Sequence, residues 1–151
     1  MTFEEKQKEV LLERFALALP ELYENLKKVC GDEEGAEIFR NVTEEKFKKN
    51  YEKIKAIKLE DMMAAETGAS RIFGWELHIE EREENGEKVW YEYLGNCPHL
   101  KATVKHGMPA PCRPVCYNDF DLLEKYNVLR AKETAHVLKG ASACCFRISR
   151  I

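Results

Sequence analysis

The first 68 residues carry apolar side chains at the spacing of an amphipathic helix. A period near 3.6 residues predicts helices with one packed face. The positions that define this pattern are Leu11, Phe15, Leu22, Leu26 and Val29. Pro20 suits the first turn of a helix and would open a second helix there, which Gly31 would end.

Further helices are predicted up to residue 68. Asp32 and Thr43 are residue types that cap helix N-termini, so each would begin a helix. The helix after Thr43 would present one apolar face, formed by Phe47, Tyr51 and Ile54. A short helix over 59–67 would then end at Gly68.

Beyond residue 72 the apolar pattern changes to strict alternation. Residues 73–79 and 89–94 predict two strands, and Asn85-Gly86 between them is a typical hairpin turn. Several aromatic residues of this hairpin could line an apolar pocket on the sheet or equally pack in its core. They are Trp75, Trp90, Tyr91 and Tyr93.

The last third of the chain predicts a helix starting near Cys97-Pro98, a rigid loop over 107–116 and a helix over 118–126. Strands over 128–137 and 143–151 would turn at Gly140. The predicted fold class is therefore α+β, with a helical N-terminal half packed on an antiparallel sheet built from two hairpins. We expect a single domain, 1–151, with a helical subregion 1–68 and a cysteine-containing subregion 69–151.

Composition narrows the possible partners. The 151 residues are 44% hydrophobic and 34% charged, with a formal net charge of −3. Basic residues are mixed with acidic ones, which argues against nucleic acid as a partner. No stretch reaches the roughly 18 consecutive apolar residues of a membrane span. The N-terminus lacks the features of a signal peptide, so we expect a cytoplasmic protein.

Six cysteines in such a protein are expected to be ligands, redox groups or buried thiols rather than disulfides. Cys112 and Cys116 have the spacing of paired zinc ligands within a proline-stiffened loop, and Cys97 begins a helix. In the last strand, Cys144 would share the inward face with Phe146 and Ile148, which leaves Cys145 outward.

These positions predict a metal centre, zinc or an iron–sulfur cluster, held by four thiolates. Its ligands would be Cys97, Cys112, Cys116 and Cys144. Buried free cysteines and a thiol nucleophile are the alternatives, and the remote Cys30 is expected to be plain core.

The segment from Cys97 onward resembles the L-2-amino-thiazoline-4-carboxylic acid hydrolase-like family. The resemblance rests on Cys97-Pro98, on Cys112, Cys116 and Asp119, and on the closing motif from Gly140 to Arg147. This last motif is also similar to the close of 4-vinyl reductase-type small-molecule-binding domains. The resemblance implies an α+β small-molecule-binding domain with clustered cysteines. For the named enzyme it implies hydrolytic opening of a cyclic, amidine-like C–N bond.

A hydrolase reaction could use metal-bound water or a cysteine nucleophile, Cys116 or Cys97, with a histidine base. The candidate catalytic residues are Cys116, His99 and Asp119, although Asp119 could equally cap a helix. His136 is expected to be exposed on its strand. A third hypothesis is a partner-binding module, in which the N-terminal helices bury an apolar stripe in a homodimer.

Overall fold

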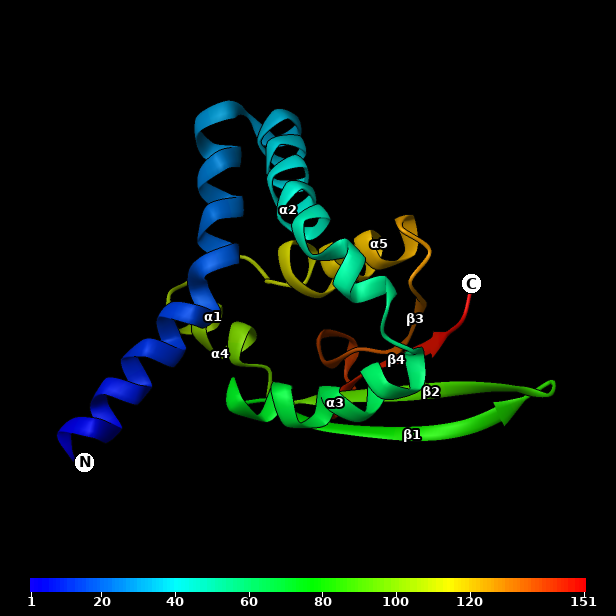
Figure 1. Ribbon diagram of the computed structural model, residues 1–151. Coiled ribbons are helices and arrows are strands. Elements are labelled where there is room, and N and C mark those ends of the chain that lie inside the picture. Colours follow the sequence, from blue (N-terminus) through cyan, green and yellow to red (C-terminus); the bar gives the residue numbers. More distant parts are fainter. The chain divides into compact units, whose positions relative to one another are not determined.

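A computed structural model describes residues 1–151 (Figure 1). The chain forms two compact units, each built from two segments. Unit 1 comprises Met1–Lys49 and Pro98–Asp119, and unit 2 comprises Asn50–Cys97 and Phe120–Ile151. The single-domain organisation stays a prediction, and the units divide the chain at residues other than the expected 68/69 boundary.

Unit 1 begins with α1 (Phe3–Cys30), a helix that starts at a capping box. The Thr2 hydroxyl accepts from the Glu5 N–H at 3.1 Å, and the Thr2 N–H donates to the Glu5 carboxylate at 2.7 Å. Pro20 lies inside this helix, so the prediction that it opens a second helix is wrong. Gly31, with φ of 93°, ends α1 as predicted.

The second helix, α2 (Asp32–Lys55), runs without interruption through Thr43. The Thr43 hydroxyl donates to the carbonyls of Phe39 and Arg40, one turn earlier, so it does not cap a new helix. Gly35 permits a close approach of α2 to α1. A Cβ at Gly35 would lie 2.4 Å from the Leu26 backbone.

The second segment of unit 1 contains α4 (Pro98–Lys105), which begins at the proline as predicted. Ala102 of α4 packs against Ala16 and Leu17 of α1 in a small buried cluster. A π-helical turn, η1 (Arg113–Tyr117), then leads into α5 (Asn118–Lys125). The prediction of a loop up to residue 116 is therefore wrong at its end, because Cys112 already has helical dihedrals.

Unit 2 contains α3 (Leu59–Ile72) and a four-stranded antiparallel sheet. Helix α3 passes through Gly68, which the sequence had placed at its end. The strands are β1 (Glu76–Glu84), β2 (Glu87–Gly95), β3 (Arg130–Ala135) and β4 (Cys144–Ser149), in the order β1-β2-β4-β3. A short helix, η2 (Val137–Lys139), joins β3 to β4.

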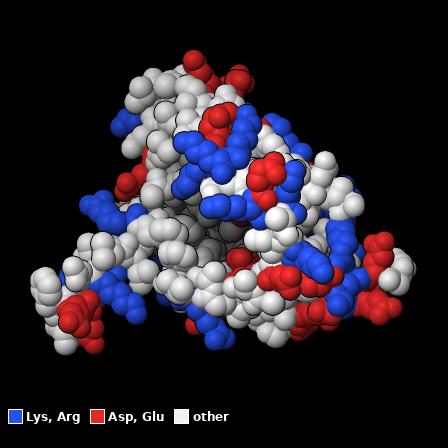
Figure 2. Space-filling view, viewed as in Figure 1, with Lys and Arg blue, Asp and Glu red and all other residues white.

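The α+β fold class with two hairpins is thus confirmed. Asn85 and Gly86 form the first hairpin turn, with φ of 54° and 80°, values that favour these two residue types. None of the helices combines the length and the apolar character needed to cross a bilayer. Positive and negative side chains lie close together on the face drawn in Figure 2.

The strand register defines two faces of the sheet. On the face that we call the inner face, Trp90 of β2 pairs with Ile148 of β4, and Leu94 pairs with Cys144. Phe120 of α5 packs against Phe146 of this face, with tilted rings whose centroids are 4.7 Å apart. The inner face therefore carries the apolar core of unit 2.

Candidate functional site

The six cysteines are all free thiols, and they are divided between the units. Cys112 and Cys116 belong to unit 1, where Cys112 directly precedes the η1 turn and Cys116 lies within it. Cys97 and Cys144 belong to unit 2. No group of three or more His, Cys, Asp or Glu side chains is placed to hold a metal ion. The four-thiolate centre stays a prediction.

Cys144 is half-buried at the start of β4, on the inner face. The Val137 N–H donates to its Sγ at 3.5 Å. Burial raises the pKa of the Cys144 thiol above its ordinary value; the Val137 N–H opposes this rise, and the nearby Glu133 carboxylate adds to it. Cys144 is consequently a neutral thiol near pH 7 and a poor nucleophile.

Cys145 lies on the opposite face from Cys144, as the alternation of the strand predicts. It is only 3% exposed, however, so its expected outward position does not leave it in solvent. Tyr93 is its cross-strand partner and contacts the thiol, and burial together with Cys145 raises the Tyr93 pKa.

The inner face carries a carboxylate that sequence reasoning missed. Glu92 of β2 is only 5% exposed, and Trp90 and Leu94 flank it on the same face of its strand. Its cross-strand partners are Ile79 of β1 and Phe146 of β4. A buried carboxylate is costly to fold unless other groups compensate for its charge, so its burial on this face marks Glu92 as a functional candidate.

A second carboxylate lies across Phe146 from Glu92. Glu133 of β3 pairs with Phe146, so both glutamates point to the inner face from either side of one phenylalanine. The Glu133 side chain is 22% exposed and forms an ion pair with Lys139 of η2 at 2.5 Å. Glu92, Glu133 and Cys144 thus belong to one chemically mixed patch, which we call the inner-face site.

His136, expected to be exposed, is in fact 5% exposed. Its ring Nδ1 accepts from the Leu138 N–H at 3.0 Å, and its carbonyl accepts from the N–H groups of Lys139 and Ala141. The prediction failed because β3 ends at Ala135 after a register shift, so strand alternation does not extend to His136. His136 orders the connection that leads to Cys144.

His99 of unit 1 is also buried, with 6% exposure. Its Nδ1 lies 2.7 Å from the Ala16 carbonyl, and burial lowers its pKa although the carbonyl opposes this effect. Pro20 explains this contact. It has no N–H to donate to the Ala16 carbonyl, four residues earlier in the helix, so that carbonyl is open to another donor. The Nδ1–H donates to Ala16, so the lone pair of the neutral ring is on Nε2, where it suits a base or a metal ligand.

Asp119, the remaining predicted catalytic residue, is exposed in the first turn of α5. Its neighbour Asn118 is buried, and the Asn118 side-chain N–H donates to the Thr43 hydroxyl at 3.0 Å. This contact fixes the start of α5 against α2 within unit 1. The catalytic assignments of Cys116, His99 and Asp119 stay predictions.

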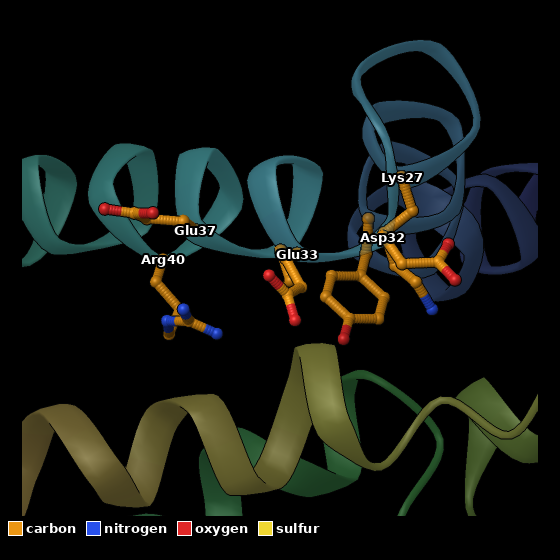
Figure 3. A pocket seen from close by; sticks show the side chains of 7 residues that line it. Lys27, Asp32, Glu33, Glu37 and Arg40 are labelled. Carbon is orange, nitrogen blue, oxygen red and sulfur yellow. The ribbon is translucent and has the colours of Figure 1, made fainter.

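A surface groove of about 540 Å³ lies where α1 meets α2 (Figure 3). Its lining is mainly charged and consists of Tyr23, Lys27, Asp32, Glu33, Ala36, Glu37 and Arg40. The Lys27 ammonium lies 4.8 Å from the centre of the Tyr23 ring. The groove contains no thiol or imidazole and none of the predicted site residues.

Comparison with known families shows which family the chain is similar to. The family model described as L-2-amino-thiazoline-4-carboxylic acid hydrolase matches residues 12–148, nearly the whole chain. Searches of curated proteins and of solved structures found no match. The family resemblance noted in the last third of the sequence is therefore confirmed, and it extends over both units.

Proposed function

Since the chain belongs to the L-2-amino-thiazoline-4-carboxylic acid hydrolase family, we propose that it hydrolyses a small cyclic amidine at the inner-face site. The observation that carries this proposal is Glu92, a carboxylate buried among apolar side chains. Glu133 and Cys144 share its face of the sheet.

The chemistry of the substrate class fits such a carboxylate. The reacting carbon of a 2-amino-thiazoline is bonded to two nitrogens and one sulfur. When protonated, this group is a planar cation whose N–H groups can donate to one oxygen of a carboxylate, which leaves the other oxygen for the attacking water. An apolar environment strengthens that interaction, because the effective dielectric constant is lower than in water.

In the proposed reaction Glu92 acts as general base and then as general acid. It takes a proton from water as the water oxygen adds to the amidine carbon. The ring C–N bond of the tetrahedral intermediate then breaks as the added hydroxyl becomes a carbonyl and its proton passes to solvent, and Glu92 returns the first proton to the leaving ring nitrogen.

Cys144 has a different role in this proposal. Its raised pKa keeps it protonated, so water rather than the thiol is the nucleophile. The thiol forms part of the wall of the site beside Glu133. The competing mechanism is direct attack on the substrate by a cysteine, Cys116 or Cys97, as inferred from the sequence.

The test compares two glutamates of the same face. Glu81 of β1 pairs with Trp90 but is 53% exposed at its side chain, where it forms an ion pair with Lys88. We expect Glu92→Gln to lower turnover of L-2-amino-thiazoline-4-carboxylate, followed by NMR, by about 100-fold or more. Glu81→Gln should stay close to wild type. An inactive wild-type protein, or a fully active Glu92→Gln variant, contradicts the proposal.

A cysteine-held metal is the second candidate, and one local observation favours it. Cys112 and Cys116 are both half-buried and are four residues apart across a helical turn, which brings their side chains to the same side. We propose this pair as two ligands of a zinc or iron–sulfur centre. Metal analysis of anaerobically purified protein should then show bound metal that a Cys112→Ser/Cys116→Ser variant loses and a Cys30→Ser variant keeps. Metal-free wild-type protein would exclude this candidate.

A further inference from the structure

Helix α1 has two apolar faces. One face is buried and contains Ala16, Leu17 and Pro20, and it packs on α4. The other face is exposed over the middle of the helix and is formed by Leu11 (62% exposed), Phe15 (45%), Leu19 (36%) and Leu22 (40%). We call these four residues the α1 stripe. In Figure 1 the N-terminal part of α1 extends beyond α4.

An exposed stripe of this kind usually marks an interaction surface. The four residues are spaced by four, four and three positions, so they lie on one side of the helix. From Leu11 to Leu22 they extend over roughly 17 Å of helix at 1.5 Å per residue. A helix with a matching stripe would cover them.

The charges beside the stripe indicate which helix that is. Arg14 and Glu21 lie on the same edge of the stripe, two helical turns apart. Neither side chain has an ion-pair or hydrogen-bond partner within the chain. The first turn of α1 is acidic, with Glu4 and Glu5, and its last turn is basic, with Lys27 and Lys28.

We propose that the α1 stripe binds the α1 stripe of a second copy of this chain, with the two helices antiparallel. A two-fold axis near the middle of the stripe places Leu11 against Leu22 of the second copy and Phe15 against Leu19 of the second copy. The contact is isologous, so each pair occurs twice.

The same register satisfies the charges. In an antiparallel pair, matching edges of the two helices face each other, so Arg14 meets Glu21 of the second copy, and this pair too occurs twice. The acidic first turn of each helix lies near the basic last turn of the other. A parallel pair would instead place like charges at the same level, which is unfavourable.

Sedimentation across a wide concentration range tests the association. The interface is small, so we expect a dissociation constant of roughly micromolar order. Leu22→Gln should abolish the dimer. Val42→Gln, on α2, replaces an apolar residue that is 51% exposed outside the stripe, and it should leave the dimer intact. A wild-type monomer at every concentration, or a dimer that tolerates Leu22→Gln, overturns the proposal.

Charge reversal tests the antiparallel register. In a dimer of the Arg14→Glu variant, two glutamates meet in both symmetric contacts. In a dimer of the Glu21→Arg variant, two arginines meet in both contacts. Each single variant should weaken the dimer by about tenfold or more. Mixing the two single variants should restore dimerisation as a heterodimer. Failure of the mixture to recover affinity overturns the antiparallel contact, whatever the activity of the inner-face site.

Discussion

Pro20 and His99 together predict a stability effect that neither residue predicts alone. Pro20 removes the amide that would serve the Ala16 carbonyl, and the His99 Nδ1–H takes its place at 2.7 Å. Ala16 is only 1% exposed, so water does not reach this position freely. We therefore expect His99→Phe, which keeps an aromatic ring without the N–H, to leave the carbonyl unpaired.

The size of the effect follows from the cost of a buried unpaired polar group. Leaving the Ala16 carbonyl without a donor should lower the free energy of unfolding by about 1–3 kcal/mol. In a Pro20→Ala background the helix supplies its own N–H to the same carbonyl. In that background, His99→Phe should lower the free energy of unfolding much less than it does in the wild type. The coupling between the two positions should therefore be roughly 1–2 kcal/mol.

Urea unfolding of the wild type, the two single variants and the double variant measures this coupling directly. The packing changes of each substitution cancel in the double-mutant cycle, provided the m-values agree. If His99→Phe lowers the free energy of unfolding equally in both backgrounds, the contact does not compensate for Pro20. The tautomer assigned to His99 would then lose its physical basis.

Three further predictions rest on separate features. Gly35→Ala should destabilise by about 1–3 kcal/mol in urea unfolding, because its Cβ meets the Leu26 backbone, whereas Gly68→Ala, with open space around it, should stabilise by up to about 1 kcal/mol. Burial lowers the pKa of His99 below 6.5, so the unfolded chain binds the proton more readily; stability should fall as the pH drops below about 6.5, and less so in His99→Phe. Iodoacetamide should alkylate Cys144 more slowly in the folded protein than in urea at the same pH, as mass spectrometry would show.

The fold could be predicted wherever a local signal agrees with the packing around it. The alternation on either side of Asn85-Gly86 predicted the first hairpin, and the left-handed dihedrals at both turn residues confirm it. Pro98 predicted the start of α4, because a proline at the first helical position loses no hydrogen bond. These signals act within a few residues, so the sequence contains all that they need.

Two of the errors, at Pro20 and Thr43, occurred where a distant residue compensates for a local interruption. Pro20 would break an isolated helix, but His99, far along the chain, donates the hydrogen bond that the proline cannot donate. Thr43 is a good capping residue, yet its hydroxyl donates back into α2 and also accepts from the Asn118 side chain. Such partners are set by tertiary structure and are invisible to propensity.

The inner-face site shows why a sequence pattern can contain a site without disclosing it. Trp90, Glu92 and Leu94 alternate onto one face, so a charge on the apolar side of β2 was visible in the sequence. Its significance depends on burial, because an exposed glutamate at that position would be an ordinary surface residue, as Glu81 is. Burial in turn depends on β4 pairing with β2 rather than only with β3, its neighbour along the chain. The strand order, which no local pattern encodes, therefore turns a common glutamate into the most informative residue for the proposed reaction.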